Sequence, residues 1–484
     1  MKLKIFGKNA VIYGIGNVGL RTSALLLIPL YTHTLSIEDY GFLSTLLLTA
    51  QLMIIFMSLG MRTVIMRFGK DFELSGSLAG LIGNTMTLNI LGGMMVAAIT
   101  LFFMRPFFAN ILHTSNVDRY LYLTCAVAFL QSTALHIMSY YRIKEQPIKF
   151  TGVGLFSAVL LFLSSLVFLL VCQLGVIGAL LAGIFSYGLI SLFLVWDVVV
   201  RRTGFHLSLN SMLKFARFGF PLIFSMLGQF LMASSGAFFI SYYHGLDSVG
   251  VYSLGSKLAM VVGIVLTLPF QLAYQPFVFN NLNKPYIREK MSRLLTYYFV
   301  AVLCLTFFIV LSSKIVLPII APPEYFDAFF ILLLLLPAMT LNGMIVFGET
   351  LLVVSKKTSM LGVIIGFSGL INLVLNNSFV PYFGLLGAII SANLSFLAAS
   401  VTITLCGLKS FPVPLEWRRI TAVLMVFMGV LACSYFFKDM HVVGFYSGLL
   451  GLATFLFYVS LNFGFFDFEE KIYIKSFLLK EIIK

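Results

Sequence analysis

Long apolar runs separated by short polar segments dominate the chain. Most runs are about 20 residues long, the length that an α-helix needs to cross a hydrocarbon core of roughly 30 Å. The pattern predicts an all-α, polytopic integral membrane protein with about 14 transmembrane helices. The predicted helices cover residues 10–32, 41–66, 78–103, 119–140, 150–172, 176–199, 213–239, 248–274, 294–317, 327–352, 358–380, 384–407, 420–437 and 442–463.

Composition agrees with the pattern. The chain of 484 residues is 60% hydrophobic and only 10% charged, whereas soluble domains have about 25% charged residues. This leaves little room for a soluble domain. The five cysteines all fall in apolar runs without metal-ligand spacing, so we expect neither a disulfide framework nor a metal site.

The distribution of lysine and arginine predicts the orientation. With the N-terminus placed in the cytoplasm, 25 of the 32 basic residues fall on cytoplasmic segments, 4 on outer segments and 3 within predicted spans. The positive-inside rule predicts such a bias in a multi-pass protein of the plasma (inner) membrane with both termini cytoplasmic. The net charge of +14 is scattered over short loops, which argues against a nucleic-acid partner.

Two features recur at an offset of 209 residues. LGVIGALLAGIFSY from Leu174 matches FGLLGAIISANLSF from Phe383, and the loop EDYGFLS around Gly41 matches DSVGVYS around Gly250. Six predicted spans separate the matched features, so the repeats are parallel and should form two pseudo-symmetric six-helix bundles with a site between them near the bilayer midplane. The predicted units are residues 1–203, residues 204–410, and residues 411–484 with two additional transmembrane helices and a basic cytoplasmic tail.

Motifs of catalysis are not evident. Gly14, Gly16 and Gly19 have the spacing of a dinucleotide-binding loop, but no strand precedes them and they lie inside an apolar run, where small residues more often permit close helix packing. The sequence also lacks a Walker A motif, an HExxH motif and a convincing nucleophile with its base. We therefore expect a transporter without catalytic residues or cofactor, and the short loops argue against a membrane-embedded sugar polymerase or ligase.

Arg21 is the most informative residue of the first predicted helix. It lies about eleven residues into the span, roughly 16 Å deep at 1.5 Å per residue. Tyr13, Asn17 and Arg21 share one helix face. A charge at that depth is costly on a lipid-facing surface, so this face should line a hydrated cavity or meet a buried partner.

Other polar residues in the spans extend this pattern. Ser44, Gln51 and Ser58 recur every seven residues, and Arg62 follows. Lys257 and Gln229 lie in the predicted eighth and seventh helices. The candidate substrate-binding residues are Arg21, Lys257, Asn17, Arg62, Gln51 and Gln229.

An alternative assigns Arg21 or Lys257 to a structural ion pair with Glu349 or Asp197. The same two acids, together with His136, are candidates for ion coupling, and a structural role for each is the competing interpretation. H⁺, Na⁺ and the membrane potential are the three candidate energy sources. Because the spans carry more cations than acids, the cavity should attract an anion, and a phosphate-bearing lipid or metabolite fits best.

The stretch GNVGLRTSALLLIPLYTHTLSIEDYGFLSTLLL from Gly16 resembles the opening of the O-antigen flippase (Wzx) type of polysaccharide biosynthesis membrane protein. INLVLNNSFVPYFGLLGAIISANLSF from Ile371 is similar to the C-terminal signature of that family, Asn-x-x-x-Asn followed by Gly-x-x-Gly-Ala. The resemblance places the chain in the superfamily that also holds multidrug-extrusion proteins and lipid II flippases.

The resemblance implies a function in lipopolysaccharide or other surface polysaccharide biosynthesis. Such flippases move an undecaprenyl-diphosphate-linked oligosaccharide from the cytoplasmic to the outer leaflet by alternating access through a cationic cavity. Arg21 matches a basic residue of their first helix, and Lys257 is a second candidate cation. The implied partners are the lipid-linked oligosaccharide, membrane lipids, and a polysaccharide polymerase with its chain-length regulator. A multidrug or cation antiporter and a lipid II flippase remain the alternatives.

Overall fold

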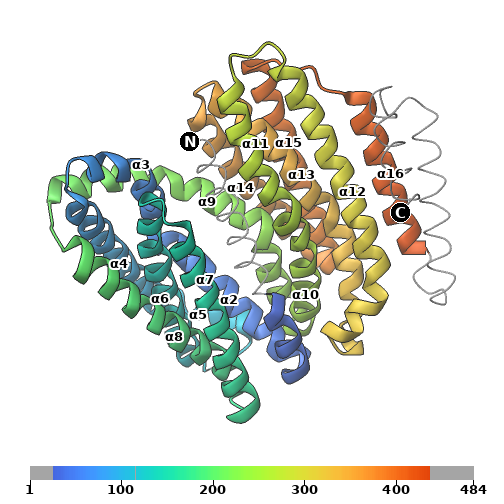
Figure 1. Cartoon of the computed structure of the whole chain (residues 1–484). Coiled ribbons are helices and arrows are strands. Elements are labelled where there is room, and N and C mark those ends of the chain that lie inside the picture. The colour runs from blue at the N-terminus through green and yellow to red at the C-terminus, as the bar shows by residue number, and fades with distance from the viewer. Residues whose placement is uncertain (1–24, 115, 437–484) are drawn as a thin grey trace, which may run out of the picture. The chain divides into compact units, whose positions relative to one another are not determined.

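The computed structural model describes residues 25–114 and 116–436, and these residues form helices and turns without a β-strand (Figure 1). Eleven helices within this part are long and apolar enough to cross a membrane, and a shorter apolar helix covers Leu25–Thr34. The predicted all-α, polytopic membrane fold is thus confirmed. The count of 14 stays a prediction, because the span 442–463 and most of 10–32 lie outside the described residues.

The chain divides into two compact units. Of the described residues, those up to 282 and 317–412 belong to the first unit, and 283–316 and those from 413 onwards belong to the second. This division does not test the predicted boundaries at residues 203 and 410, which stay a prediction.

Within the first unit, the helices before residue 204 form one group, coloured blue to green in Figure 1. Helix α6 is at its centre, because it contacts α2, α4 and α8. The group consists of α2 (Ile37–Ser58), α3 (Met61–Leu74), α4 (Leu78–Phe102), α5 (Arg105–Leu112), α6 (Val117–Ile143), α7 (Pro147–Leu166), η1 (Val167–Val171), α8 (Gly175–Leu194) and η2 (Val195–Thr203).

The later helices of the first unit form a second group. It consists of α9 (Leu209–His244), α10 (Leu246–Val262), η3 (Gly263–Thr267), α11 (Leu268–Asn281), η4 (Pro323–Tyr325), α13 (Ala328–Val354), α14 (Thr358–Phe383) and α15 (Leu385–Ser410). Helix α9 has Pro221 in its interior and extends from the first group to the second (Figure 1). It contacts α3 and α4 in the first group and α14 and α15 in the second.

The second unit contains most of α12 (Ile287–Ile320) and α16 (Trp417–Phe436). Glu416, just before α16, links the two helices. Its carboxylate accepts a hydrogen bond of 2.8 Å from Thr296 Oγ1, and its backbone amide donates to Ser292 Oγ at 3.1 Å.

Two local expectations were wrong. The predicted helix 41–66 is interrupted, because Leu59 and Gly60 both have positive φ angles, of 44° and 70°. Gly60 packs against the backbone of Gly219 on α9, where a side chain would not fit. The predicted loop around Gly41 is instead helical, since α2 begins at Ile37 with Ser36 as its N-cap.

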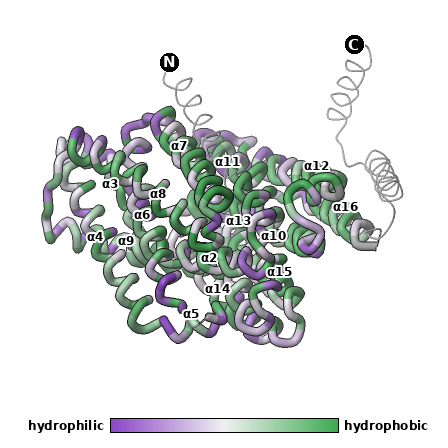
Figure 2. Tube along the Cα trace, turned by 90° about the horizontal axis from the view of Figure 1, so that it is seen from below, coloured by the Kyte–Doolittle hydropathy of each residue, from purple (hydrophilic) through white to green (hydrophobic). Residues whose placement is uncertain are grey.

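Polar residues mark the two ends of the first unit. Apolar residues dominate its helices, and α2, α10 and α13 lie side by side near the centre of Figure 2. We call the end that carries the basic segments 67–70, 142–149, 201–217 and 356–357 the basic end. The other end, with the loops around residues 35, 113, 245 and 322, is the opposite end; it is the outer end in the predicted orientation.

Candidate functional site

Helices α2 and α10 pack tightly at the opposite end of the first unit. A Cβ on Gly41 would collide with the carbonyl oxygen of Leu246, and a Cβ on Gly250 would collide with that of Ile37. Both the glycines and their two partners are separated by 209 positions. The contact is therefore two-fold symmetric, as a repeat of 209 residues predicts. We call it the glycine contact.

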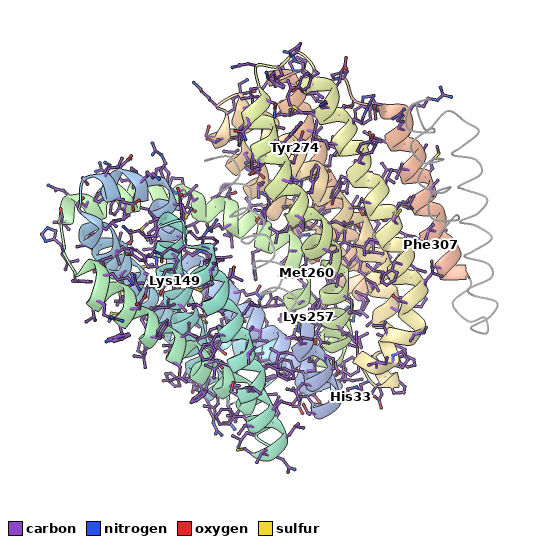
Figure 3. The ribbon with its side chains drawn as sticks, viewed as in Figure 1. His33, Lys149, Lys257, Met260, Tyr274 and Phe307 are labelled. Atoms are coloured by element: carbon purple, nitrogen blue, oxygen red, sulfur yellow. The ribbon has the colours of Figure 1, made fainter. Side chains whose placement is uncertain are left out.

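Lys257 bridges the same two helices beyond the glycine contact. It lies eleven residues after the start of α10, or roughly 16 Å along the helix. Its Nζ donates hydrogen bonds to Tyr40 Oη at 3.1 Å and to Ser44 Oγ at 3.4 Å. The ammonium also lies 4.7 Å from the centroid of the Tyr40 ring. In Figure 3 Lys257 lies where α10 meets α2.

The partners of this ammonium are neutral. Tyr40 is fully buried and Lys257 is half-buried. No carboxylate lies within 4.0 Å of Lys257 among the residues that the structure describes. Neither Glu349 nor Asp197 therefore forms the alternative structural ion pair with Lys257.

Further hydrogen bonds at the opposite end join helices of the two groups and the last residues of α12, which also belong to the first unit. Thr32 Oγ1 donates to the carbonyl of Ile320, and His33 Nε2 lies 3.3 Å from that of Ile319. His113 Nε2 lies 2.7 Å from the carbonyl oxygen of Ser241, whose hydroxyl donates to Ile111. Figure 3 shows His33 at this end. The two groups are thus held together at the end opposite to the basic loops.

Towards the basic end, this face of α2 exposes one polar residue, and Ser58, two heptads after Ser44, is buried again. Gln51 lies one heptad after Ser44, so the two share a face, yet Gln51 is exposed whereas Ser44 is buried. Gln229 on α9 is also exposed, and Met260, three residues after Lys257, is 40% exposed. Gln51 of α2, Gln229 of α9 and Met260 of α10 are therefore accessible side chains.

The remaining predicted cations differ in their placement. Arg62 is exposed in the first turn of α3, just after the interruption at Gly60, and no carboxylate among the described residues pairs with it. Arg21 and Asn17 lie outside the described residues, so their assignment to a binding site stays a prediction.

The predicted coupling residues lie in separate surroundings. Asp197 accepts two hydrogen bonds of 2.9 Å from Arg202 and one of 2.7 Å from Tyr141. Glu349 on α13 is half-buried, and none of the described residues forms an ion pair with it. His136 is fully buried, with Nε2 3.2 Å from Thr85 Oγ1. These three residues do not form one cluster with Lys257.

A buried network that the sequence did not predict joins α9, α14 and α15. Ser235 Oγ donates to Asn372 Oδ1 at 2.6 Å, and Asn372 Nδ2 donates to Ser395 Oγ at 3.0 Å. Asn376 Nδ2 lies 3.0 Å from Ser235 Oγ and 2.8 Å from Asn372 Oδ1. All four side chains are uncharged. The i, i+4 spacing of Asn372 and Asn376 was visible in the sequence, but their serine partners lie on other helices.

The chemistry available at the α2–α10 contact is recognition of an anion. An ammonium that is bonded only to hydroxyl groups can exchange them for a phosphate oxygen, which is a stronger acceptor. Among the described residues, no group of three or more His, Cys, Asp or Glu side chains could hold a metal ion.

Solved structures of membrane transporters share this fold. The lipid II flippase MurJ in an inward closed conformation superposes with a TM-score of 0.69 and 11% identity, covering 98% of this chain and 100% of that one. A MOP superfamily transporter from Pyrococcus furiosus gives 0.61 at 16% identity, covering 86% and 96%. The Vibrio cholerae MATE transporter VcmN gives 0.61 at 13% identity, covering 84% and 96%.

A comparison of the sequence with models of protein families identifies the family of this chain. No curated protein matches the chain. A family model does match residues 6–281, more than half of the 484 residues, and it is described as polysaccharide biosynthesis protein. This match agrees with the multi-pass membrane fold, and the chain belongs to the polysaccharide biosynthesis protein family.

Proposed function

We propose that the protein is a flippase for a lipid-linked oligosaccharide whose headgroup is a diphosphate, with undecaprenyl diphosphate as the lipid carrier. The observation that carries this proposal is Lys257. It is a cation roughly 16 Å along a membrane-spanning helix, it lies between the two helix groups, and hydroxyl groups accept its hydrogen bonds. Membership in the polysaccharide biosynthesis protein family supports a lipid-linked oligosaccharide as the proposed substrate.

The physical need for such a residue follows from the substrate. Ionised phosphates cannot enter hydrocarbon without a large loss of hydration energy. A cation in a hydrated passage compensates that charge, while the sugars stay in water and the prenyl tail stays in lipid. Arg21 and Arg62 are our further candidates for phosphate contacts, and Asn17, Gln51 and Gln229 are our candidates for hydrogen bonds to the headgroup or the sugars.

Alternating access completes the proposal. The hydrogen bonds at the opposite end close one side, and the exposed Gln51 and Gln229 support a hydrated space towards the basic end, since amides are costly against lipid. In the predicted inner-membrane orientation, substrate enters from the cytoplasm. Rocking of the two helix groups then opens the outer side.

Energy coupling and partners remain part of the proposal. Glu349 is a stronger candidate for coupling to H⁺ or Na⁺ than Asp197, because Asp197 already accepts two hydrogen bonds from Arg202. The membrane potential acting on the diphosphate is the other source of energy. A polysaccharide polymerase and its chain-length regulator are the proposed protein partners.

Deletion of the protein in its native host tests the function. We expect lipid-linked oligosaccharide to accumulate on the cytoplasmic leaflet and surface polymer to be lost, with both restored by the wild-type chain. A multidrug or cation antiporter, which the half-buried Glu349 favours, predicts instead increased drug sensitivity and unchanged distribution of the lipid. A lipid II flippase predicts accumulation of peptidoglycan precursor. Either of these outcomes would overturn the proposed substrate.

A further inference from the structure

Lys257 is part of the closure itself. Its acceptor Tyr40 directly precedes Gly41 of the glycine contact, and the Tyr40 ring packs edge-on against Tyr325 at 5.8 Å. Tyr40 corresponds by the repeat to Val249, eight residues before Lys257 on α10. The lysine side chain therefore extends back towards the opposite end, the direction that helical side chains favour, and joins α10 to α2 there.

The bridge differs from the other contacts that close this end. Backbone carbonyls accept the hydrogen bonds of Thr32, His33 and His113, and none of these three donors is an ammonium or a guanidinium group. The ammonium of Lys257 is the one full positive charge in the described hydrogen bonds across α2 and α10. Phosphate is an ionised acceptor, whereas the hydroxyl groups of Tyr40 and Ser44 are neutral, so phosphate adds attraction between opposite charges and competes best for this donor.

We propose that Lys257 is a substrate-released bridge: a diphosphate that binds its ammonium withdraws it from Tyr40 and Ser44, and this separates the opposite ends of α2 and α10. The inference rests on the proposed function, because the ligand is the same diphosphate headgroup. It adds that one residue both holds the substrate and controls the exit side. Opening without substrate is then disfavoured, which keeps the passage closed in the resting protein.

The distance between the opposite ends of α2 and α10 is the quantity to measure. Glu38 and Asp247 are exposed, lie in the first turns of the two helices and correspond by the repeat. Spin labels at Glu38→Cys and Asp247→Cys, in a full-length chain whose five native cysteines are replaced, report this distance by pulsed electron paramagnetic resonance in lipid nanodiscs. Retained surface polymer in the host verifies the labelled chain.

Without ligand, the variant Tyr40→Phe/Ser44→Ala removes both acceptors and keeps the cation. We expect the ratio of long to short distances to rise about tenfold, because bonds to charged groups are the stronger class. Ser256→Ala is the matched control, since its hydroxyl donates within α10 to Tyr252. Equal distributions in the double variant and wild type overturn the bridge. Tyr40→Phe alone, which keeps the ring, serves if the double variant does not fold.

With ligand, undecaprenyl diphosphate is the probe and undecaprenol is its uncharged control. The diphosphate should shift the wild type to longer distances, undecaprenol should not, and Lys257→Gln should start at longer distances and not respond. Binding of the diphosphate is measured separately by native mass spectrometry. Binding without a shift in distance overturns the bridge alone, whereas absence of binding overturns the proposed function as well.

Discussion

Two polar regions of the first unit differ in how their groups are paired. In the α9–α14–α15 network, Ser235, Asn372, Asn376 and Ser395 are uncharged, buried and bonded to one another. At the α2–α10 contact, a charged Lys257 meets hydroxyl groups of the other helix group. The first arrangement fixes three helices of one group, whereas the second joins the two groups through bonds that an anion can replace. Changes in the two regions should therefore have different consequences.

The largest effect on transport is expected at Lys257. Lys257→Gln should reduce the transfer of undecaprenyl diphosphate across reconstituted vesicles by about 10- to 100-fold, because a bond to a charged group contributes about 1.5–3 kcal/mol. Thermal stability in detergent should stay close to that of the wild type. Lys149→Gln is the matched control, since Lys149 is exposed on α7 (Figure 3). Equal losses in both variants would mean that overall charge, and not this site, matters.

The second-largest effect on transport is expected at the glycine contact. Gly41→Ala places a Cβ against the carbonyl of Leu246, and such overpacking costs about 1–3 kcal/mol. Because only the closed arrangement contains the contact, the variant should populate open outer ends and flip lipid several-fold more slowly. The distance between spin labels at Glu38→Cys and Asp247→Cys measures this opening. Gly152→Ala is the control, as open space surrounds Gly152, and identical distance distributions in both variants would refute the expectation.

A substitution in the α9–α14–α15 network should lower the stability of the protein more than its transport rate. Asn372→Leu leaves Ser235, Asn376 and Ser395 without a shared partner, so we expect a loss of stability of about 1–2 kcal/mol, in the range of hydrogen bonds between membrane helices. Thermal unfolding in detergent measures the loss. Ser378→Ala, on the exposed side of the same helix, should change little. Unaltered stability together with abolished transport would show that the network takes part in transport directly.

The smallest effect is expected at Gln51. Gln51→Ala removes an exposed amide one heptad after Ser44, and a single neutral hydrogen bond of about 0.6 kcal/mol corresponds to a two- to threefold change in transfer rate. The vesicle assay used for Lys257 measures it, with Gln51→Asn as the conservative comparison. A loss as large as that of Lys257→Gln would assign Gln51 a more central role.

Sequence alone predicted the apolar spans well, because length and hydropathy are local properties. It also predicted that Gly41 and Gly250 are equivalent, but it could not show that they touch, since the contact depends on how the two helix groups pack. The interruption at Leu59–Gly60 was missed because apolar residues continue through it, and only packing against Gly219 makes the bend evident.

The candidate site was predictable only in part, because the sequence shows local properties but not the contacts between distant helices. Lys257 was identified from its depth in an apolar run. Its partner Tyr40 lies 217 residues away in the chain. The sequence predicts a loop at Tyr40, because the two preceding acidic residues are typical of loops. Glu38 and Asp39 instead follow the N-cap Ser36, where negative charge favours a helix N-terminus.

The most direct test of the account is the affinity of the nanodisc-embedded protein for undecaprenyl diphosphate and for undecaprenol. The account predicts that the wild type binds the diphosphate at least about tenfold more tightly than the alcohol, and that Lys257→Gln removes most of this difference. Equal affinities for the two lipids, or a preference that Lys257→Gln leaves unchanged, would contradict it.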